Sequence, residues 1–214
     1  QTTHRLCQTL EAEGFLTRAS GTKKYSAARR LRMMGAGLLH HSQSHIARRQ
    51  ILMQVAQEVG ETVNFVVATD QGMSYLDRVE TDWAFRIQLP IGSHVPFHCT
   101  ASGKCFLASL PQPRRAAFVA ALTLEQLTPA TKTDPDALQA DLKAIRSRGY
   151  ALDEEEFIDG MIAIAVPITD AAGHFMAALA YHGPTQRMSI DGAIERFGML
   201  QDAAARLRDV LSDA

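Results

Sequence analysis

The sequence contains few cysteines, few aromatic residues and no long apolar run. Its 214 residues include three Cys and one Trp, and aromatic residues make up 7% of the chain. Cys7, Cys99 and Cys105 are odd in number and lack metal-ligand spacing, so we expect free thiols in a cytoplasmic protein with no bound metal. The longest apolar stretches, such as Met161–Ile168, are too short to cross a bilayer, so no membrane partner is expected.

Motifs of common catalytic machinery are also missing. No Gly-x-Ser-x-Gly sequence occurs, and the eight His residues form no recognisable nucleophile–base pair. The segment Ala101–Lys104 lacks the leading glycine of a phosphate-binding loop. We therefore expect neither an enzyme nor a cofactor.

The charges, in contrast, are unevenly distributed. The first fifty residues carry nine Lys or Arg and two acidic residues, whereas the other 164 carry thirteen basic and twenty-one acidic ones. The overall charge of −1 is therefore the sum of about +7 on residues 1–50 and about −8 on residues 51–214. A basic N-terminal segment (residues 1–50, the basic front) joined to an acidic remainder indicates a polyanion partner such as nucleic acid. The alternative is a basic helix that is merely solvated.

The basic front predicts a helix followed by a hairpin. Thr2 or Thr3 caps a helix with Leu6 and Leu10 on one face, and Gly14 ends it. A short strand from residue 15, a turn at 20–22 and a returning strand at 23–25 follow.

This order of elements is that of the second half of a winged helix-turn-helix, whose helix enters the major groove of double-stranded DNA. The side chains at the front of the helix would contact bases or phosphates, and the hairpin lysines would contact phosphates. The predicted DNA-binding residues are Thr2, Thr3, His4, Arg5, Lys23 and Lys24.

The next segment shows Leu31, Met34 and Leu38 at helical spacing, which indicates a linker helix. These three apolar side chains could contact a second subunit or pack onto their own domain. The helical spacing of apolar residues is lost at residues 40–44, which we take as a domain boundary. A second helix is predicted over Ile46–Val59.

The rest of the chain favours an α+β domain with an antiparallel sheet, because strand hairpins are separated by helices. A loop is expected over Pro90–Pro96, and Ser189 begins one final helix reaching Leu211. The predicted strands are Thr62–Ala68, Met73–Val79, Ala84–Leu89, Met161–Thr169 and His174–His182, and the middle helix runs from Asp134 to Gly149.

The best small-molecule site is the start of a helix over Ala101–Ser109 that Thr100 can cap. Free N–H groups in a first helical turn attract anions, small residues allow close approach, and Lys104 adds positive charge. A carboxylate is the expected ligand. The alternative is that the small residues only allow close packing on the sheet.

The acidic run Asp153–Glu156 is most simply a solvated loop, although one member could accept a hydrogen bond from a ligand. His98 or His182 could approach these carboxylates around a metal, but no ligand spacing supports such a site.

Several motifs, in order, resemble the IclR family of bacterial transcription regulators. They are TTHRL at 2–6, GFL at 14–16, Tyr25, GETV at 60–63, PFHCTASGK at 96–104, RGYALDEEE at 148–156 and GP at 183–184. The chain departs from the pattern at Tyr181-His182, just before the last motif.

The resemblance implies a partial winged helix-turn-helix (1–27), a linker helix (28–44) and a GAF/PAS-like effector domain (45–214) with a central antiparallel sheet flanked by helices. It also implies that two helices of the winged domain lie upstream of this sequence. The implied partners are a double-stranded DNA operator, a small carboxylate effector and a second copy or more of the chain, as a homodimer or homotetramer.

The resemblance also implies an effector site. The amides of Ala101 and Ser102 would hold the carboxylate and Asp153 would face it. The implied walls are Ile87, Val95, Met161, Ala163, Ala180 and His182. Because Ala163 and Ala180 are apolar where polar side chains are common, a larger, partly apolar or aromatic acid is favoured, with His182 as a hydrogen-bond partner.

The leading hypothesis is therefore a ligand-responsive DNA-binding transcription regulator, with activator and repressor both left open. One alternative is a stand-alone carboxylate sensor. Another is an enzyme acting on a small carboxylate in the same pocket, with Asp153 or His98 as its base.

Overall fold

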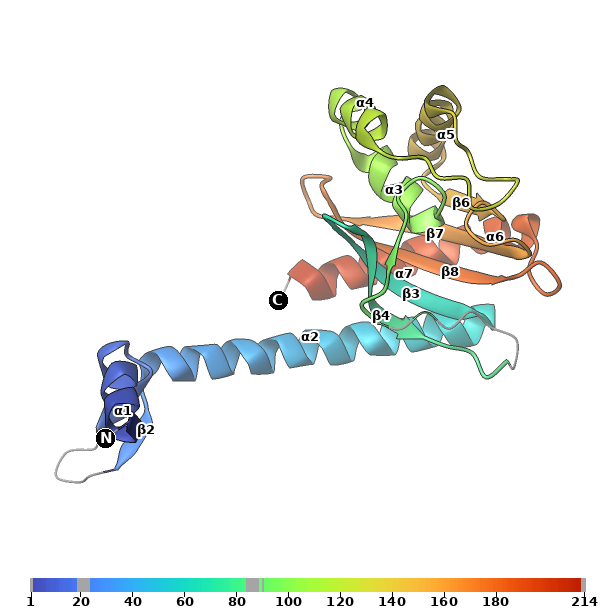
Figure 1. The fold of residues 1–214 in the computed structure, drawn as a ribbon. Helices are drawn as coiled ribbons and strands as arrows, with labels where there is room; N and C mark the ends of the chain where they lie inside the picture. The colour runs from blue at the N-terminus through green and yellow to red at the C-terminus, as the bar shows by residue number, and fades with distance from the viewer. Residues whose placement is uncertain (1, 19–23, 84–88, 90, 213–214) are drawn as a thin grey trace. The chain divides into compact units, whose positions relative to one another are not determined.

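The computed structural model describes residues 2–18, 24–83, 89 and 91–212. The chain divides into two compact units between Ala47 and Arg48, and one helix, α2 (Arg29–Val59), continues through that point (Figure 1). The finer division into 1–27, 28–44 and 45–214 stays a prediction.

The first unit contains the predicted helix and hairpin. Helix α1 (Thr2–Ala12) leads to strand β1 (Leu16–Arg18), which pairs antiparallel with β2 (Tyr25–Ala27). Gly14 follows the helix with φ +75°, a conformation that favours glycine. Helix α1 buries none of its residues among the described part of the chain. That this unit belongs to a winged helix-turn-helix stays a prediction.

Helix α2 is continuous where the sequence predicted a break. Residues 40–44 are helical, so the expected linker helix and the helix over Ile46–Val59 are one element of 31 residues. The prediction was wrong because loss of apolar periodicity reports a change in burial and not a break in the backbone. No proline occurs between residues 29 and 59 to interrupt the helix. Leu31 is partly exposed, and the side chains of Met34 and Leu38 lie outside the described residues.

A six-stranded antiparallel sheet forms the centre of the second unit. Its order is β5-β4-β3-β8-β7-β6, so β3 and β8, far apart in sequence, lie side by side in the middle. The strands are β3 (Thr62–Thr69), β4 (Gly72–Val79), β5 (His94–Val95), β6 (Ala151–Glu154), β7 (Met161–Thr169) and β8 (Phe175–Pro184). The central antiparallel sheet flanked by helices is confirmed.

Two segments predicted as loops contribute edge strands. β5 lies within Pro90–Pro96, and β6 includes the first half of the acidic run. Both strands are short, and neither shows the alternation of apolar and polar residues that predicts a strand. The strand predicted over Ala84–Leu89 lies, except for Leu89, outside the described residues.

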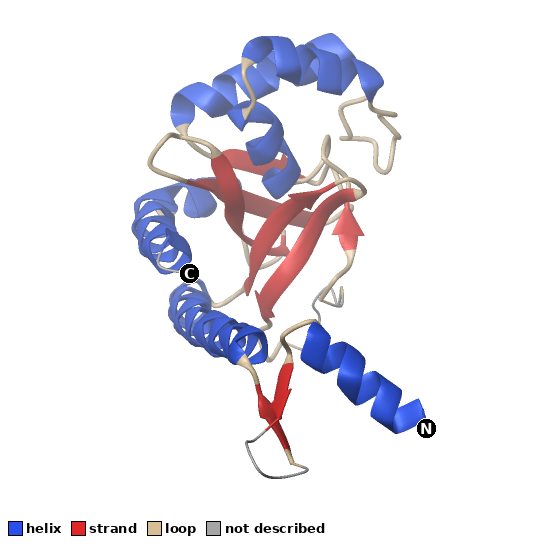
Figure 2. Ribbon diagram, turned by 90° about the vertical axis from the view of Figure 1, so that its left-hand side faces the viewer, coloured by secondary structure: helices blue, strands red, loops and turns tan. Residues whose placement is uncertain are grey.

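Helices cover both faces of the sheet (Figure 2). The end of α2 packs with α6 (Ile190–Glu195) and α7 (Phe197–Ser212) on one face. On the other face lie α3 (Ala101–Ser109), α4 (Gln112–Ala121) and α5 (Pro135–Arg148). The single helix expected from Ser189 is split at Arg196, whose φ of −88° and ψ of 4° end α6.

Candidate functional site

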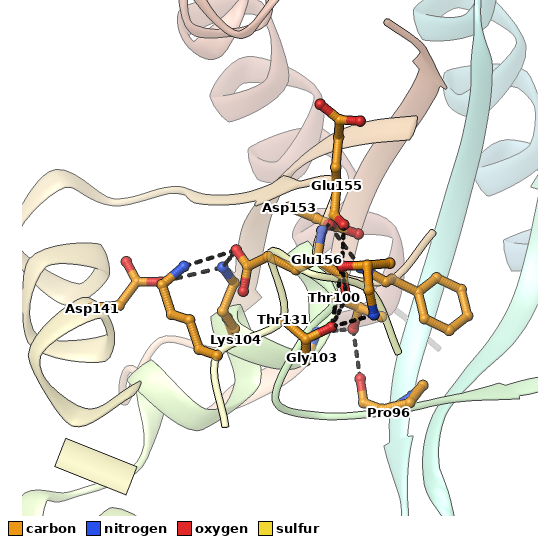
Figure 3. A network of polar contacts seen from close by, with 12 residues as sticks. Pro96, Thr100, Gly103, Lys104, Thr131, Asp141, Asp153, Glu155 and Glu156 are labelled. Carbon is orange, nitrogen blue, oxygen red and sulfur yellow. Dashed lines mark hydrogen bonds and ion pairs between the residues drawn. The ribbon is translucent and has the colours of Figure 1, made fainter. Parts of the chain in front are cut away.

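The first turn of α3 has two backbone amides without an acceptor among the described residues. Thr100 caps the helix: its Oγ1 accepts from the Gly103 amide at 3.1 Å and donates to the Pro96 carbonyl at 2.7 Å (Figure 3). The Lys104 amide donates to the Thr100 carbonyl at 2.9 Å. No described residue accepts from the amides of Ala101 or Ser102, the two amides predicted from the sequence to hold a carboxylate. Two N–H groups at the positive end of a helix dipole favour an anion.

Gly103 lets this helix end sit close to its neighbour. A Cβ atom there would lie 2.4 Å from the Phe97 carbonyl oxygen and 2.6 Å from the Phe97 Cα. Any side chain would therefore push the α3 terminus away from the Phe97 backbone. Gly103 therefore serves close packing, and a role of the small residues in admitting an anion stays a prediction.

A partly open cavity of about 40 Å³ lies beside the two amides, on the α3 face of the sheet. Most of its wall is apolar. The lining residues are Asn64, Tyr75, Leu89, Thr100, Ala101, Ser102, Asp153, Phe157, Ile158, Met161, Ile162, Ala163, Ala180 and His182.

Most of the effector residues predicted from sequence line this one cavity. They are Ala101, Ser102, Asp153, Met161, Ala163, Ala180 and His182. Val95 is buried in the core on the same face of the sheet but does not line the cavity. Ile87 lies outside the described residues. That any of these residues binds an effector stays a prediction.

Sequence reasoning missed several lining residues, chiefly Asn64 and Tyr75. Asn64 is 1% exposed and lies between the buried apolar residues Val63 and Phe65 of strand β3. A polar residue at such a position is a usable signal, because buried amides need hydrogen-bond partners.

Asp153 is buried, in contrast to the solvated loop expected for the acidic run. Its Oδ1 accepts from the amides of Glu156 at 2.8 Å and Phe157 at 3.2 Å. Burial raises the pKa of Asp153 to about 7; nearby Lys104 opposes this shift and Glu156 adds to it. The expectation failed for Asp153 and Glu156, which are buried, whereas Glu154 is exposed. Backbone amides compensate Asp153, and Lys104 and Lys132 pair with Glu156.

This pKa predicts a pH-dependent stability. A carboxyl whose pKa is raised by folding stabilises the fold fully below its unfolded pKa, and this stability is lost as pH rises through about 7. We expect the free energy of unfolding to fall by roughly 2 kcal/mol more between pH 5 and pH 8 in the wild type than in Asp153→Asn. Urea unfolding at both pH values measures this difference. Parallel pH profiles for the two proteins would contradict it.

Lys104 does not line the cavity, contrary to the expectation that its charge lies beside the ligand. Its Nζ pairs with Glu156 Oε1 and, at 3.2 Å, with Asp141 Oδ2 (Figure 3). Lys132 Nζ reaches the same two carboxylates at 3.0 and 3.4 Å. Thr131 Oγ1 donates to the Glu156 carbonyl at 2.6 Å. The network ties the acidic segment to α3 and α5.

Asn64 and His182 form a polar pair across the central strands. Asn64 Nδ2 and His182 Nδ1 are 3.0 Å apart. Burial lowers the pKa of His182 to about 3, with a contribution from the positive charge of Arg78, so the ring is neutral near pH 7. His98, the other histidine considered for metal or base chemistry, has its Nε2 2.9 Å from the Glu125 carbonyl and does not line the cavity.

The predicted DNA contacts lie on the first unit. Thr2, Thr3, His4 and Arg5 are exposed at the start of α1, and Lys24 is exposed just before β2. Lys23 lies outside the described residues. Within the described part of the chain, no helix is long and apolar enough to span a membrane.

The chain matches known proteins along most of its length. The family described as "Bacterial transcriptional regulator IclR C-terminal" matches residues 37–208. The chain is 39% identical over 191 residues to the probable transcriptional regulator SauR of Cupriavidus necator, covering 89% of this chain and 76% of SauR.

Solved structures have the same fold. The Thermotoga maritima IclR structure has a TM-score of 0.74 at 27% identity, covering 97% of this chain and 84% of that one. A PobR inducer-binding domain from Acinetobacter was solved as a double mutant in complex with 3-hydroxybenzoic acid. It has a TM-score of 0.68 at 29% identity, covering 74% of this chain and 94% of that one.

These matches place the chain among the bacterial transcriptional regulators. Within that class, it belongs to the IclR family, as its motifs indicated.

Proposed function

We propose that this protein is a ligand-responsive DNA-binding regulator whose second unit binds a small carboxylate. The observation that carries the proposal is the pair of unpartnered Ala101 and Ser102 amides beside a cavity. The ligand's carboxylate would accept from these two amides. The mostly apolar wall would hold the rest of the molecule.

The site's chemistry supports a carboxylate. Asp153, with a pKa of about 7, carries a proton in a large share of molecules near neutral pH and can then donate to a second carboxylate. The PobR domain was solved with a carboxylic acid, 3-hydroxybenzoic acid. A cavity of about 40 Å³ has room for about three water molecules, because each needs ~10–15 Å³. It fits a small acid as it stands, and an aromatic acid requires apolar wall residues to move outward.

A route from the cavity to α2 is also present within the second unit. Tyr75 on β4 lines the cavity, and Asp77 two residues further is buried against α2. Asp77 Oδ2 lies 3.3 Å from Arg48 Nε, and Oδ1 lies 2.9 Å from Arg49 Nη1. We propose that an effector favouring one position of β4 shifts α2, which continues into the basic first unit. Tight binding without such a preference would change nothing.

The proposed partners follow from the family and the charge. The first unit, with Arg5 at the exposed start of α1, would contact a double-stranded operator. A palindromic operator requires two copies of the reader, so we propose a homodimer or homotetramer.

Two variants test the proposed ligand binding and the proposed DNA binding separately, and each variant is the control for the other. Ser102→Trp fills the cavity and should weaken binding of small carboxylates at least about tenfold while DNA affinity is kept. Arg5→Ala should weaken DNA binding by about fivefold or more while carboxylate affinity is kept. The measurements are calorimetric titration with propionate, lactate and benzoate, and gel shifts with a duplex that the wild-type protein selects from a random pool.

The outcomes separate the halves of the proposal. Carboxylate binding that persists in Ser102→Trp would remove the cavity assignment. Unchanged DNA affinity in Arg5→Ala would remove the assignment of α1 as the reader. Wild-type DNA binding should also weaken steeply as salt is raised.

A further inference from the structure

Two buried polar atoms on residues that line the cavity have no hydrogen-bond partner among the described residues. Asn64 Oδ1 and His182 Nε2 are both inaccessible to solvent, and neither makes a hydrogen bond with any residue that the structure describes. Asn64 is 1% exposed, and both residues line the cavity beside Ala101 and Ser102. A buried polar group without a partner is costly, so two on one wall indicate a ligand that satisfies them.

The pair requires one donor and one acceptor from its ligand, whichever way the amide is oriented. If Asn64 Nδ2 donates to His182 Nδ1, the neutral ring carries its proton on Nε2, and Oδ1 is left as an acceptor. If the amide is turned over, its N–H₂ group faces the cavity and Nε2 becomes an acceptor. Either arrangement offers the ligand one donor and one acceptor.

A hydroxyl group satisfies both arrangements, because it donates one hydrogen bond and accepts others. A carbonyl or carboxylate oxygen only accepts, and would leave one of the two atoms unpaired. A methyl group would leave both unpaired.

We propose that the Asn64–His182 pair selects a hydroxycarboxylate: an acid held by the α3 amides whose hydroxyl group is bound by Asn64 and His182. This inference rests on the proposed function and names the ligand class of the same site. Asn64 thereby becomes a specificity residue.

The test compares acids that differ only by the hydroxyl. Calorimetric titration of the full chain uses lactate against propionate, 3-hydroxybutyrate against butyrate, and 3-hydroxybenzoate against benzoate. In the wild type we expect at least one hydroxy acid to bind about tenfold or more tightly than its partner, because the deoxy acid leaves buried polar atoms unpaired.

Asn64→Leu keeps the approximate volume and removes the side-chain amide, one of the two groups that would bind the hydroxyl. We expect the ratio of the hydroxy-acid and deoxy-acid affinities to fall to within about threefold, whatever the change in the affinity for the deoxy acid alone. The deoxy acid is thus the internal control for an intact site. If Asn64→Leu does not fold, His182→Phe provides the same comparison.

Each outcome is decisive. Equal affinity within every acid pair, or a preference that survives in both variants, overturns the hydroxyl assignment but leaves the carboxylate site standing. Absence of binding by all six acids overturns the proposed function and this inference together.

Discussion

Replacing Gly103 with alanine is expected to destabilise the second unit by about 3 kcal/mol and to displace the N-terminal end of α3, where we propose that an anion binds. The new Cβ would lie 2.4–2.7 Å from three backbone atoms of Phe97. Backbone cannot rotate away as a flexible side chain can, so the helix end or the 96–100 segment must shift. The Ala101 and Ser102 amides would move with it.

Denaturant unfolding measures the stability change, and carboxylate titration measures the loss of the site. Gly198→Ala is the matched control, because Gly198 is helical and a Cβ there meets nothing within 4 Å. That control should be neutral or slightly stabilising, since alanine is the better helix former. A Gly103→Ala protein as stable as the control would contradict the packing argument.

Breaking the buried ion pair of Lys104 and Glu156 is the second large expected effect. Their side chains are 1% and 2% exposed, so removing one partner leaves a buried charge with less compensation. We expect Lys104→Met and Glu156→Leu each to lower the free energy of unfolding by about 3 kcal/mol. The remaining carboxylate or ammonium keeps one other partner, Lys132 or Asp141, which limits the loss.

The double variant distinguishes charge burial from lost packing. Because the double variant leaves neither charge, it should be less destabilised than the sum of the single variants. Arg208→Met is the control, since its pair with Asp209 is 45% and 67% exposed and should matter by less than ~0.5 kcal/mol. Strict additivity would show that these residues do not act as a pair.

The helices around the site were predictable because their end signals are local. Thr100 accepts from an amide three residues away, and Asp134 caps α5 in the same way. Gly149 ends α5 with φ +86°, where glycine is favoured. Such contacts lie within a few residues, so they can be recognised in a linear sequence.

The expectations that failed concern burial. The Asp153–Glu156 run looks solvated because four acidic residues together usually face water. Glu156 of this run is buried because Lys104 and Lys132, which lie well before it in the sequence, pair with its carboxylate. The continuity of α2 was missed for a related reason, since its apolar pattern depends on which neighbours cover each turn.

The sequence by itself determined the charge difference between the two parts, the capped helix at Ala101 and the motifs of the IclR family. These depend on residue identity and near neighbours. Only the tertiary structure decided that Asn64 and His182, 118 residues apart, meet in one cavity with two unused atoms. The pairing of β3 with β8 brings them together, and such a long-range contact follows from the packing of the whole sheet.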